Sequence, residues 1–405
     1  MLEYLQNNPF IKSSVIVMFK NNKLSYFLYF ISYIFILTIT SPAKALDIDA
    51  REYILVDFQT WTVLAEKNAD EPMPPSSMSK LMTAYMLFEA VHSGAVSLDD
   101  YFDVSENAWR KGGAASGGST MFLEPNSRVR VEDLLRGIII QSGNDACIVV
   151  AEEMAGTEDT FAIEMTERAL EIGLKGSNFT NSTGLPDKDH YMTSRDLATL
   201  ARRIIKDFPE YYSLYSERNF TYNGIKQFNR NPLLSVPGNA DGLKTGRTSI
   251  AGYGLTASAM RDGRRLILVA NGMKTAKIRS SETSKLMDWG FRNFTNKNLF
   301  RKGEIISNAD VWLGEEKVVP LILQEDISIT IPRQAWRTLQ VKVVYSGPVP
   351  SPIIEGQKIG TLVIDGEKMT PLEYELFASK GIEKLGFFKR IKAAANHILF
   401  GYSNE

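Results

Sequence analysis

The sequence predicts an α+β protein, in which an antiparallel sheet with a cluster of helices is followed by a small all-β domain and a C-terminal amphipathic helix. Between residues 50 and 297, the patterns follow in the order strands, helices, strands, helix, which fits an antiparallel sheet with helices on its faces. Between residues 302 and 364, short alternating runs are separated by turn residues, which is typical of an all-β domain. From Lys384 to Tyr402, apolar residues recur at helical spacing.

The N-terminus predicts an export signal over residues 1–45. Two lysines precede an uncharged run at 24–41, and Ala43-Lys44-Ala45 then provides the small residues that a signal peptidase requires. An uncleaved membrane anchor is the alternative, because the run is nearly long enough to span a bilayer. Met18 is an alternative start of the chain. Either interpretation places the rest of the chain outside the cytoplasm.

Residues 46–298 are predicted to form the first domain after this signal. Leu81, Met82, Tyr85 and Phe88 recur at helical spacing and indicate a helix over 80–91. Thr193 or Ser194 opens another helix, with Asp196 in its first turn. The remaining expected elements are a hairpin at 53–57 and 62–65, helices at 131–140, 145–154, 193–205 and 281–294, and strands that begin at 244–246 and continue at 253–259 and 265–270.

Residues 302–380 are predicted to form the small β-rich domain. Turn residues such as Gly314, Pro332 and Gly356 separate its short apolar runs. Strands are expected at 311–313, 318–323, 327–331, 339–345 and 359–364.

The last helix, at 384–402, is predicted to bind the surface of a membrane. One face carries apolar residues that include Phe388 and Ile391, the opposite face carries Lys389 and Arg390, and no acid occurs between its ends. A basic amphipathic helix suits an anionic membrane surface. The alternative is a terminal helix that docks on its own protein.

Composition excludes several classes of function. A single cysteine, Cys147, rules out an intramolecular disulfide framework and cysteine-rich metal sites. Its proximity to a candidate motif suggests sensitivity to thiol reagents, although free cysteines are mostly buried and inert. Three scattered histidines argue against a structural zinc, so no metal and no cofactor is expected. The formal net charge of −1 gives no drive toward nucleic acid.

Three short motifs carry the chemistry: Ser77-Met-Ser-Lys80, Ser142-Gly-Asn144 and Lys244-Thr-Gly246. Residues at i and i+3 share a helix face, so Ser77 and Lys80 can point into the same cleft. No histidine lies near a candidate nucleophile in the sequence, and a lysine base is therefore the simplest interpretation. The second and third motifs are ordinary turn and strand sequences when taken alone, and only their order beside the first gives them weight.

A lysine side chain has a reference pKa of about 10.4, so it is normally protonated and a poor base. It becomes a useful base when its surroundings favour the neutral amine. Burial or a nearby cation does this, and Lys244 is the candidate cation. Lys80 would then take the proton of Ser77, and Ser142 would relay a proton to the leaving amine. Asn144 would hold a substrate amide, while Lys244 and Thr245 would bind its terminal carboxylate. Gly246 would let the substrate backbone approach the strand edge.

These motifs make the sequence resemble the low-molecular-mass penicillin-binding proteins, specifically the serine-type D-alanyl-D-alanine carboxypeptidases. The resemblance extends to Met121-Phe-Leu-Glu-Pro125, Gln141-Ser-Gly-Asn-Asp-Ala146, Asn229-Arg230-Asn231 and Asp241-Gly-Leu-Lys-Thr-Gly246, and it covers essentially all of the mature chain. It implies a penicillin-binding or β-lactamase-like fold. It also implies a serine hydrolase that removes the terminal D-Ala from peptidoglycan stem pentapeptides and is acylated by β-lactams.

The resemblance further implies roles for single residues. Ser77 would be acylated, and Lys80 would be the general base. The backbone N–H groups of Ser77 and Arg247 would form the oxyanion hole. Arg230 and Arg279 would lie near the substrate carboxylate. Arg247 is a departure, because relatives often carry histidine after Lys-Thr-Gly. The family's layout implies an exported, periplasmic protein on the outer face of the cytoplasmic membrane, with a part in cell-wall synthesis and cell shape.

Three alternatives share these motifs. A class A β-lactamase needs a glutamate on an Ω-like loop for deacylation, but the stretch 184–196 contains aspartates and no glutamate. An endopeptidase that acts on cross-linked muropeptides would use the same carboxylate clamp. A wall-binding or β-lactam-sensing module would be acylated once without turnover. The sequence leaves open the balance of carboxypeptidase and endopeptidase activity and the oligomeric state.

Overall fold

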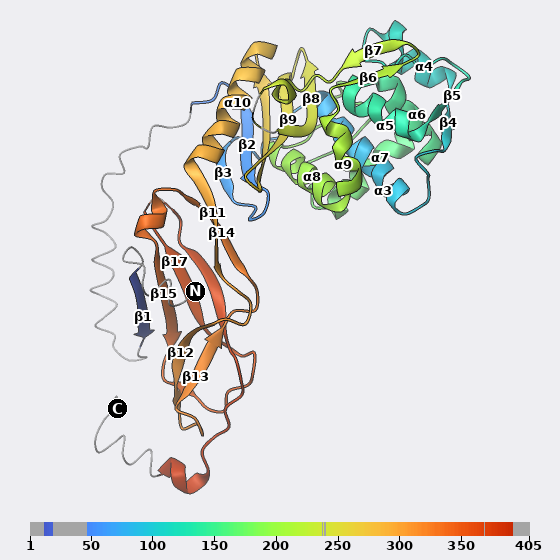
Figure 1. Ribbon diagram of the computed structural model, residues 1–405. Coiled ribbons are helices and arrows are strands. Elements are labelled where there is room, and N and C mark those ends of the chain that lie inside the picture. The colour runs from blue at the N-terminus through green and yellow to red at the C-terminus, as the bar shows by residue number, and fades with distance from the viewer. Residues whose placement is uncertain (1–11, 19–46, 237, 239, 368, 392–405) are drawn as a thin grey trace. The chain divides into compact units, whose positions relative to one another are not determined.

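The computed structural model describes residues 12–18, 47–236, 238, 240–367 and 369–391 (Figure 1). The chain divides into two compact units: one runs from Leu46 to Arg292, and the other combines residues up to Ala45 with those from Asn293 onward. Strands and helices share the first unit, whereas strands dominate the second. The predicted α+β class is therefore confirmed.

The sheet of the first unit is antiparallel, with the strand order β3-β2-β10-β9-β8. Asp262 and Gly263 join its two longest strands with φ angles of 51° and 76°, as in a two-residue turn whose twist matches the strands it connects. The expected hairpin and strands are confirmed. Their bounds are β2 (Glu52–Asp57), β3 (Val63–Lys67), β8 (Ala240–Thr248), β9 (Gly252–Arg261) and β10 (Arg264–Met273).

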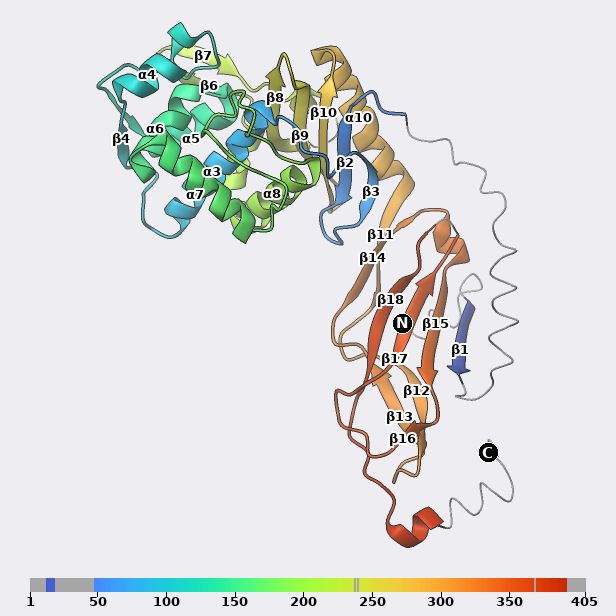
Figure 2. The same ribbon diagram turned by 180° about the vertical axis from the view of Figure 1, so that it is seen from behind.

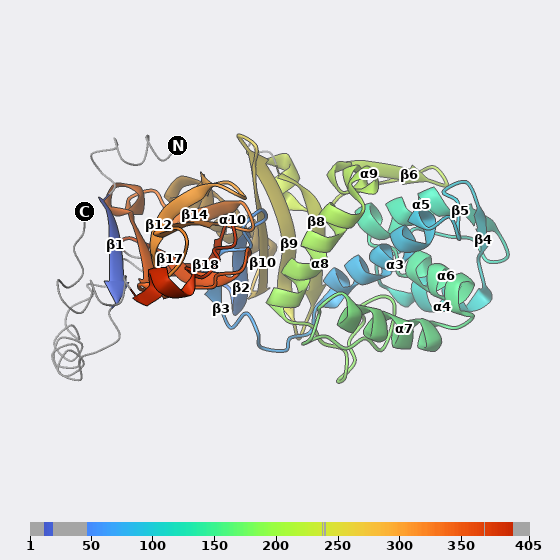
Figure 3. The same cartoon turned by 90° about the horizontal axis from the view of Figure 1, so that it is seen from below.

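The helices of this unit lie on both faces of the sheet, with one long helix on one face and the helical cluster on the other (Figure 3). The long helix is α10 (Ala276–Asn293). The cluster comprises α3 (Lys80–His92), α4 (Glu106–Gly112), α5 (Val131–Arg136), α6 (Asn144–Ala155), α7 (Glu158–Glu171), α8 (Ser194–Asp207) and α9 (Pro209–Tyr212).

Alternation along β2 explains how two layers of helices are held. Successive strand residues point to opposite faces, and Ile54 and Val56 belong to the core that contains the helical cluster. Leu55 points to the other face, where Gly290 of α10 leaves room for it. A Cβ at Gly290 would lie 2.6 Å from Leu55 Cδ2, so α10 packs closely on the sheet.

Helix starts follow from their capping residues. Thr193 accepts a hydrogen bond from the Asp196 N–H at 3.0 Å and begins α8 as predicted. In contrast, α10 begins before the expected Ser281, because the Thr275 hydroxyl accepts from the Ile278 N–H at 3.1 Å. Helices α4 and α7 were not predicted from the sequence.

The second unit contains a seven-stranded sheet of order β1-β15-β17-β18-β13-β12-β16 and a separate pair, β11-β14. Each expected strand overlaps an observed one, whereas β11, β16 and β18 were not predicted. β1 lies within the predicted export signal and runs parallel to β15 (Figure 2). The bounds are β1 (Lys12–Met18), β11 (Phe294–Phe300), β12 (Ile305–Trp312), β13 (Val318–Ile322), β14 (Ile327–Pro332), β15 (Gln340–Ser346), β16 (Val349–Pro350), β17 (Lys358–Asp365) and β18 (Leu372–Ala378).

The predicted terminal segments fall largely outside the described residues. Residues 387–391 are helical, and the rest of the helix expected up to residue 402 is not among those described. The same holds for most of the predicted export signal. Within the described parts of the chain, no helix has the length and apolar character needed to cross a membrane.

Candidate active site

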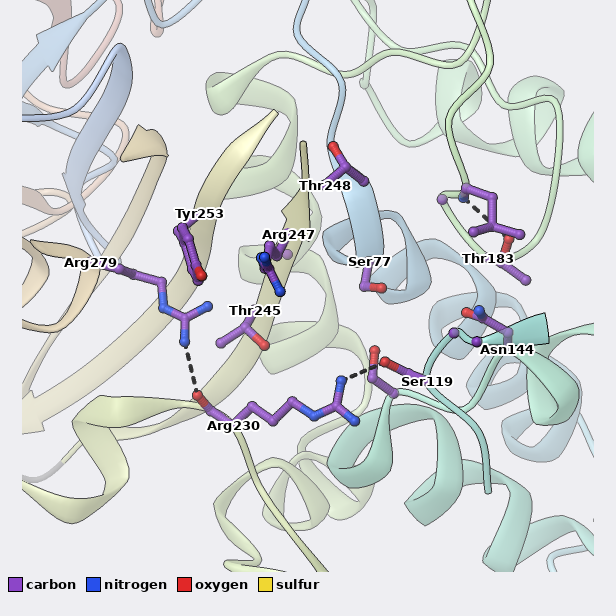
Figure 4. Close-up of a pocket in the computed structure, with 16 residues that line it drawn as sticks. Ser77, Ser119, Asn144, Thr183, Arg230, Thr245, Arg247, Thr248, Tyr253 and Arg279 are labelled. Carbon is purple, nitrogen blue, oxygen red and sulfur yellow. Dashed lines mark hydrogen bonds between the residues drawn. The ribbon is translucent and has the colours of Figure 1, made fainter. Parts of the chain in front are cut away.

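A cavity of about 540 Å³ lies in the first unit, between the 3₁₀ turn Ser76–Ser79, strand β8 and the loops before α6 and α8 (Figure 4). It brings together the candidate residues of all three motifs, and the two lysines are buried next to it. None of its lining residues is acidic. They are Ser77, Gly117, Gly118, Ser119, Ser142, Asn144, Thr183, Gly184, Leu185, Arg230, Thr245, Gly246, Arg247, Thr248, Tyr253 and Arg279.

Ser77 and Lys80 lie where the 3₁₀ turn enters α3. Pro74 and Pro75 precede the turn, in keeping with the expected helix start. Lys80 Nζ lies 3.2 Å from Ser77 Oγ, within hydrogen-bond distance. The hydroxyl faces the cavity while the lysine is only 1% exposed. The i, i+3 spacing therefore produces the contact that a serine nucleophile and a lysine base require.

Two further acceptors fix the amine of Lys80. Its Nζ donates to Asn144 Oδ1 at 2.7 Å and to the Thr183 carbonyl at 2.5 Å. Both oxygens can only accept, so a neutral amine satisfies them with its two N–H bonds and keeps its lone pair for Ser77. Burial lowers the pKa of Lys80, and the positive charge of Arg230 lowers it further. Lys244 was the nearby cation expected from the sequence, and Thr183 was not predicted.

Ser142 faces Lys244 across the cavity wall. The expected helix at 131–140 is α5 continued by a π-helical turn, which ends at Ser142 with φ 61°. This left-handed conformation is uncommon for a residue other than glycine and is often found at functional sites. Lys244 Nζ donates to Ser142 Oγ at 2.9 Å. Burial holds the pKa of Lys244 well below its usual range, and the charge of Lys80 lowers it further. A positive charge on either lysine thus disfavours one on the other.

The turn that bears Ser77 is held between two glycines. A Cβ on Gly246 would lie 2.8 Å from the Pro75 carbonyl oxygen and 3.1 Å from Ser76 Cβ. Gly184 has φ +76°, and a Cβ there would lie 2.0 Å from the Ser76 carbonyl oxygen. The predicted role of Gly246, room for a substrate backbone, stays a prediction. The glycine lines the cavity, and its missing side chain also lets β8 pack against the catalytic turn.

Asp145 organises the loop on the opposite side of the cavity, a role that was not predicted from the sequence. Its buried carboxylate accepts hydrogen bonds from the Thr120 hydroxyl at 2.6 Å and from the backbone N–H groups of Met121 at 2.8 Å and Leu123 at 3.1 Å. The loop is tied to α6 again by the Asn144 N–H, which donates to the Ser119 carbonyl at 2.8 Å. The aspartate that follows Ser-Gly-Asn is the sequence signal for this anchor.

Arg230 reaches into the cavity from the segment after β7 (Ile225–Phe228). Its guanidinium donates to Ser119 Oγ at 2.5 Å, as Figure 4 shows. The flanking Asn231 is buried and donates to the Gly242 carbonyl at 2.8 Å, which ties this segment to the start of β8. Burial lowers the pKa of Arg230.

Tyr253 lies between two arginines at one end of the cavity (Figure 4). It pairs with Arg247 directly across β8 and β9, and the Arg247 guanidinium carbon lies 5.1 Å from the ring centroid. The guanidinium carbon of Arg279, from α10, lies 5.6 Å from the same centroid. Both arginines were predicted site residues, whereas Tyr253 was not. No motif marks a tyrosine that acts only through stacking.

His190 contacts the catalytic turn behind the nucleophile. Thr180 N–H donates to His190 Nδ1 at 3.1 Å, so the ring proton is on Nε2, which lies 2.7 Å from Ser79 Oγ. Burial lowers the pKa of His190 to about 4. The ring hydrogen-bonds Ser79 and not Ser77, so it supports the turn and does not serve as the base.

Cys147 is fully buried on α6. Burial raises the pKa of its thiol to about 12, which leaves it protonated at neutral pH. The expected burial of this cysteine is confirmed, and its inertness toward thiol reagents stays a prediction. No cluster that could hold a metal ion occurs among the residues described.

Comparison with known proteins identifies relatives along most of the chain. The D-alanyl-D-alanine carboxypeptidase family (peptidase S11) matches residues 38–275, and the C-terminal domain of penicillin-binding protein 5 matches residues 294–384. D-alanyl-D-alanine carboxypeptidase DacC of Escherichia coli K12 is 39% identical over 351 residues, which is 86% of this chain and 88% of DacC.

Solved structures show the same similarity. Penicillin binding protein 5 from Haemophilus influenzae is 36% identical with a TM-score of 0.74, covering 86% of this chain and 100% of that chain. Penicillin-Binding Protein D2 from Listeria monocytogenes, in its ampicillin-bound form, is 30% identical with a TM-score of 0.53, covering 60% of this chain and 98% of that chain.

Proposed function

The chain belongs to the peptidase S11 family of D-alanyl-D-alanine carboxypeptidases, and from this premise we propose that it removes the terminal D-alanine from peptidoglycan stem pentapeptides through an acyl-enzyme on Ser77. The observation that carries the proposal is the Lys80 amine, which lies 3.2 Å from Ser77 Oγ while two acceptor oxygens hold its other bonds. The family assignment agrees with the resemblance seen in the sequence.

The first step forms the acyl-enzyme. Neutral Lys80 takes the Ser77 proton, and Ser77 Oγ attacks the carbonyl carbon of the penultimate D-alanine. The backbone N–H groups of Ser77 and Arg247 would then receive the oxyanion. As the tetrahedral intermediate collapses, the C–N bond breaks and the leaving amine gains the proton that Lys80 took from Ser77, relayed through Ser142. That hydroxyl lies 2.9 Å from Lys244 Nζ, which stabilises it as a proton donor. Water then attacks the acyl carbonyl carbon and gives a proton to Lys80, which returns it to Ser77 as the ester bond breaks.

Substrate binding uses the edge of the sheet and its positive charge. β8 is an edge strand, so its outer backbone groups can pair with an extended peptide. Thr245, Arg230 and Arg279 line the same cavity and suit the C-terminal carboxylate of the peptide. Arginine is well matched to a carboxylate because its planar fork donates two parallel hydrogen bonds. The positive charge of these arginines explains why the substrate peptide would need a free C-terminal carboxylate.

Deacylation separates this proposal from the β-lactamase alternative. A class A β-lactamase requires a glutamate that activates water beside the acyl-enzyme. The loop before α8 contributes Thr183, Gly184 and Leu185 to the cavity, and Asp187 and Asp189 of this loop are exposed. Since no acid lines the cavity, a penicilloyl adduct is expected to persist for many minutes. Hydrolysis of the adduct within milliseconds would instead identify a β-lactamase.

The decisive experiment follows free D-alanine during incubation with a pentapeptide that ends in D-Ala-D-Ala. The wild-type chain should release many equivalents, and Ser77→Ala should release none. Unchanged release by the variant would refute the assignment of Ser77. Release of a single equivalent by the wild type would identify a module that is acylated without turnover.

The proposal extends to location. An export signal at residues 1–45 and a basic amphipathic helix at 384–402 would place the enzyme on the outer face of the cytoplasmic membrane, next to its substrate and within the machinery that maintains the cell wall. Phe387, Phe388 and Ile391 support the second part, because they are 63%, 84% and 55% exposed beside basic residues. Truncation after Gly381 should release the protein from membranes without lowering activity. If the truncated chain still sediments with membranes, the helix is not the anchor.

A further inference from the structure

The cavity carries more positive charge than one terminal carboxylate can balance. We infer that the enzyme favours a leaving residue with a second carboxylate on its side chain, and that Arg247 binds this second group. The inference rests on the proposed carboxypeptidase activity and extends it to the class of residue that is released. Arg247 would be a specificity-determining residue, with Tyr253 as the residue that positions it.

The charges in the cavity have no carboxylate counterion among the residues that the structure describes. Arg230, Arg247 and Arg279 line this cavity, and among the described residues none of the three forms an ion pair with a carboxylate. Two arginines elsewhere in the same unit are paired with carboxylates: Arg264 lies 2.9 Å from Asp57, and Arg265 lies 2.7 Å from Asp241. Arg230 and Arg247 are exposed at the cavity and Arg279 is half-buried, so all three can be reached by a ligand. Three positive charges around one cavity attract a ligand that carries negative charge.

Arg247 is placed to bind a group beyond the terminal carboxylate. It follows Thr245 by two residues on β8, so both side chains leave the same face of the strand. Two strand residues span about 6.6 Å, a separation that the length of an arginine side chain can adjust. A carboxylate held at Thr245 and Arg230 would thus leave Arg247 free for a second acidic group of the same residue.

Stacking on Tyr253 orients the guanidinium of Arg247 for this contact. Its guanidinium lies over the Tyr253 ring, and Arg279 contacts the same ring, so the ring holds two like charges near each other (Figure 4). A stacked guanidinium keeps its N–H edges free to donate two hydrogen bonds to a carboxylate. A neutral amide of equal size can accept a hydrogen bond but does not neutralise the charge. The structure therefore favours an acidic D-residue of about glutamate length.

The test uses three peptides with the same acyl portion, ending in D-Ala-D-Ala, D-Ala-D-Glu and D-Ala-D-Gln. D-glutamine is the neutral control for D-glutamate. For the full chain, kcat/KM for release of D-glutamate should exceed that for D-glutamine about tenfold, the effect of one charge-assisted hydrogen-bond pair at an accessible site. The advantage should shrink at high salt, because salt screens exposed charges.

The variants Arg247→Gln and Arg110→Gln form a matched pair. Arg110 is exposed on α4, where it pairs with Glu106 outside the cavity. Arg247→Gln should bring the ratio of D-glutamate to D-glutamine release to about one, whereas Arg110→Gln should keep the wild-type ratio. General damage to the fold lowers both rates and leaves their ratio unchanged, so the ratio reports recognition of the charge.

Two results would overturn the inference while the carboxypeptidase assignment stands. One is equal release of D-glutamate and D-glutamine by a wild-type chain that turns over D-Ala-D-Ala. The other is a preference for D-glutamate that survives in Arg247→Gln. Absence of turnover with all three peptides would instead overturn the proposed function, and this inference with it.

Discussion

His190 should make the first unit lose stability in acid. The histidine is buried with Nδ1 accepting from the Thr180 N–H, so the fold holds it neutral. Burial lowers its pKa from 6.5 to about 4. The unfolded chain binds a proton near pH 6.5, whereas the folded chain resists protonation until about pH 4. Its contribution to stability is therefore complete above pH 6.5, falls as the pH decreases, and is fully lost near pH 4.

The size of this loss follows from the two pKa values. At about 1.36 kcal/mol per pKa unit, the difference between 6.5 and about 4 corresponds to about 3 kcal/mol. This is a large part of the stability of an ordinary domain, which is about 5–15 kcal/mol. One buried ring can therefore decide whether the catalytic unit stays folded in acid.

Urea unfolding at several pH values between about 7 and about 4 measures the effect. The helical signal in circular dichroism reports the first unit, because the long helices of the described chain lie there. His190→Gln keeps a donor for Ser79 and removes the titration, so its free energy of unfolding should fall by about 3 kcal/mol less than that of the wild type. His92→Gln, at an exposed position, should behave as the wild type does. Equal pH dependence in wild type and His190→Gln would refute the reasoning.

The remaining predictions concern the catalytic turn, its base and the buried thiol. Gly246→Ala should slow acylation by penicillin about a hundredfold, because the new Cβ collides with the Pro75 carbonyl and displaces the turn that bears the nucleophile. A stopped-flow rate equal to that of the wild type would show that the packing is not needed. The acylation rate should rise with pH as Lys80, whose pKa is lowered, loses its proton. Arg230→Gln should move this rise to higher pH, because removal of a positive charge favours the protonated amine. A pH profile that is unchanged or shifted to lower pH in Arg230→Gln would contradict the role of the Arg230 charge. Cys147 should remain unmodified by thiol reagents in the native protein, as read by mass spectrometry, and rapid labelling without unfolding would disprove its burial.

Local patterns were sufficient for most elements of the fold. The helix after Ser77 and the helix capped by Thr193 were predicted because apolar spacing and capping residues act within a few positions along the chain. The strands of the second unit alternate between buried and exposed residues, which made most of them visible. The start of α10 was misplaced, because Thr275 caps the helix ahead of its apolar pattern.

Only the site residues whose side chains carry recognisable chemistry were predicted from the sequence. Ser77, Lys80 and Lys244 belong to motifs whose spacing implies a nucleophile, a base and a cation. Thr183 was not predicted because it contributes a backbone carbonyl, which any residue could supply. Tyr253 contributes only the face of its ring, so its sequence context carries no signal.

The sequence by itself determined the α+β class, the family and the reacting pair Ser77 and Lys80. A serine and a lysine three residues apart, where a 3₁₀ turn enters a helix, are brought together by local geometry alone. Only the tertiary structure decided what surrounds that pair. Distant segments must meet before Thr183 can accept from Lys80 or before Gly246 can give the catalytic turn its room. Burial, which sets the protonation of both lysines, is likewise a property of the packed fold and not of any short stretch of chain.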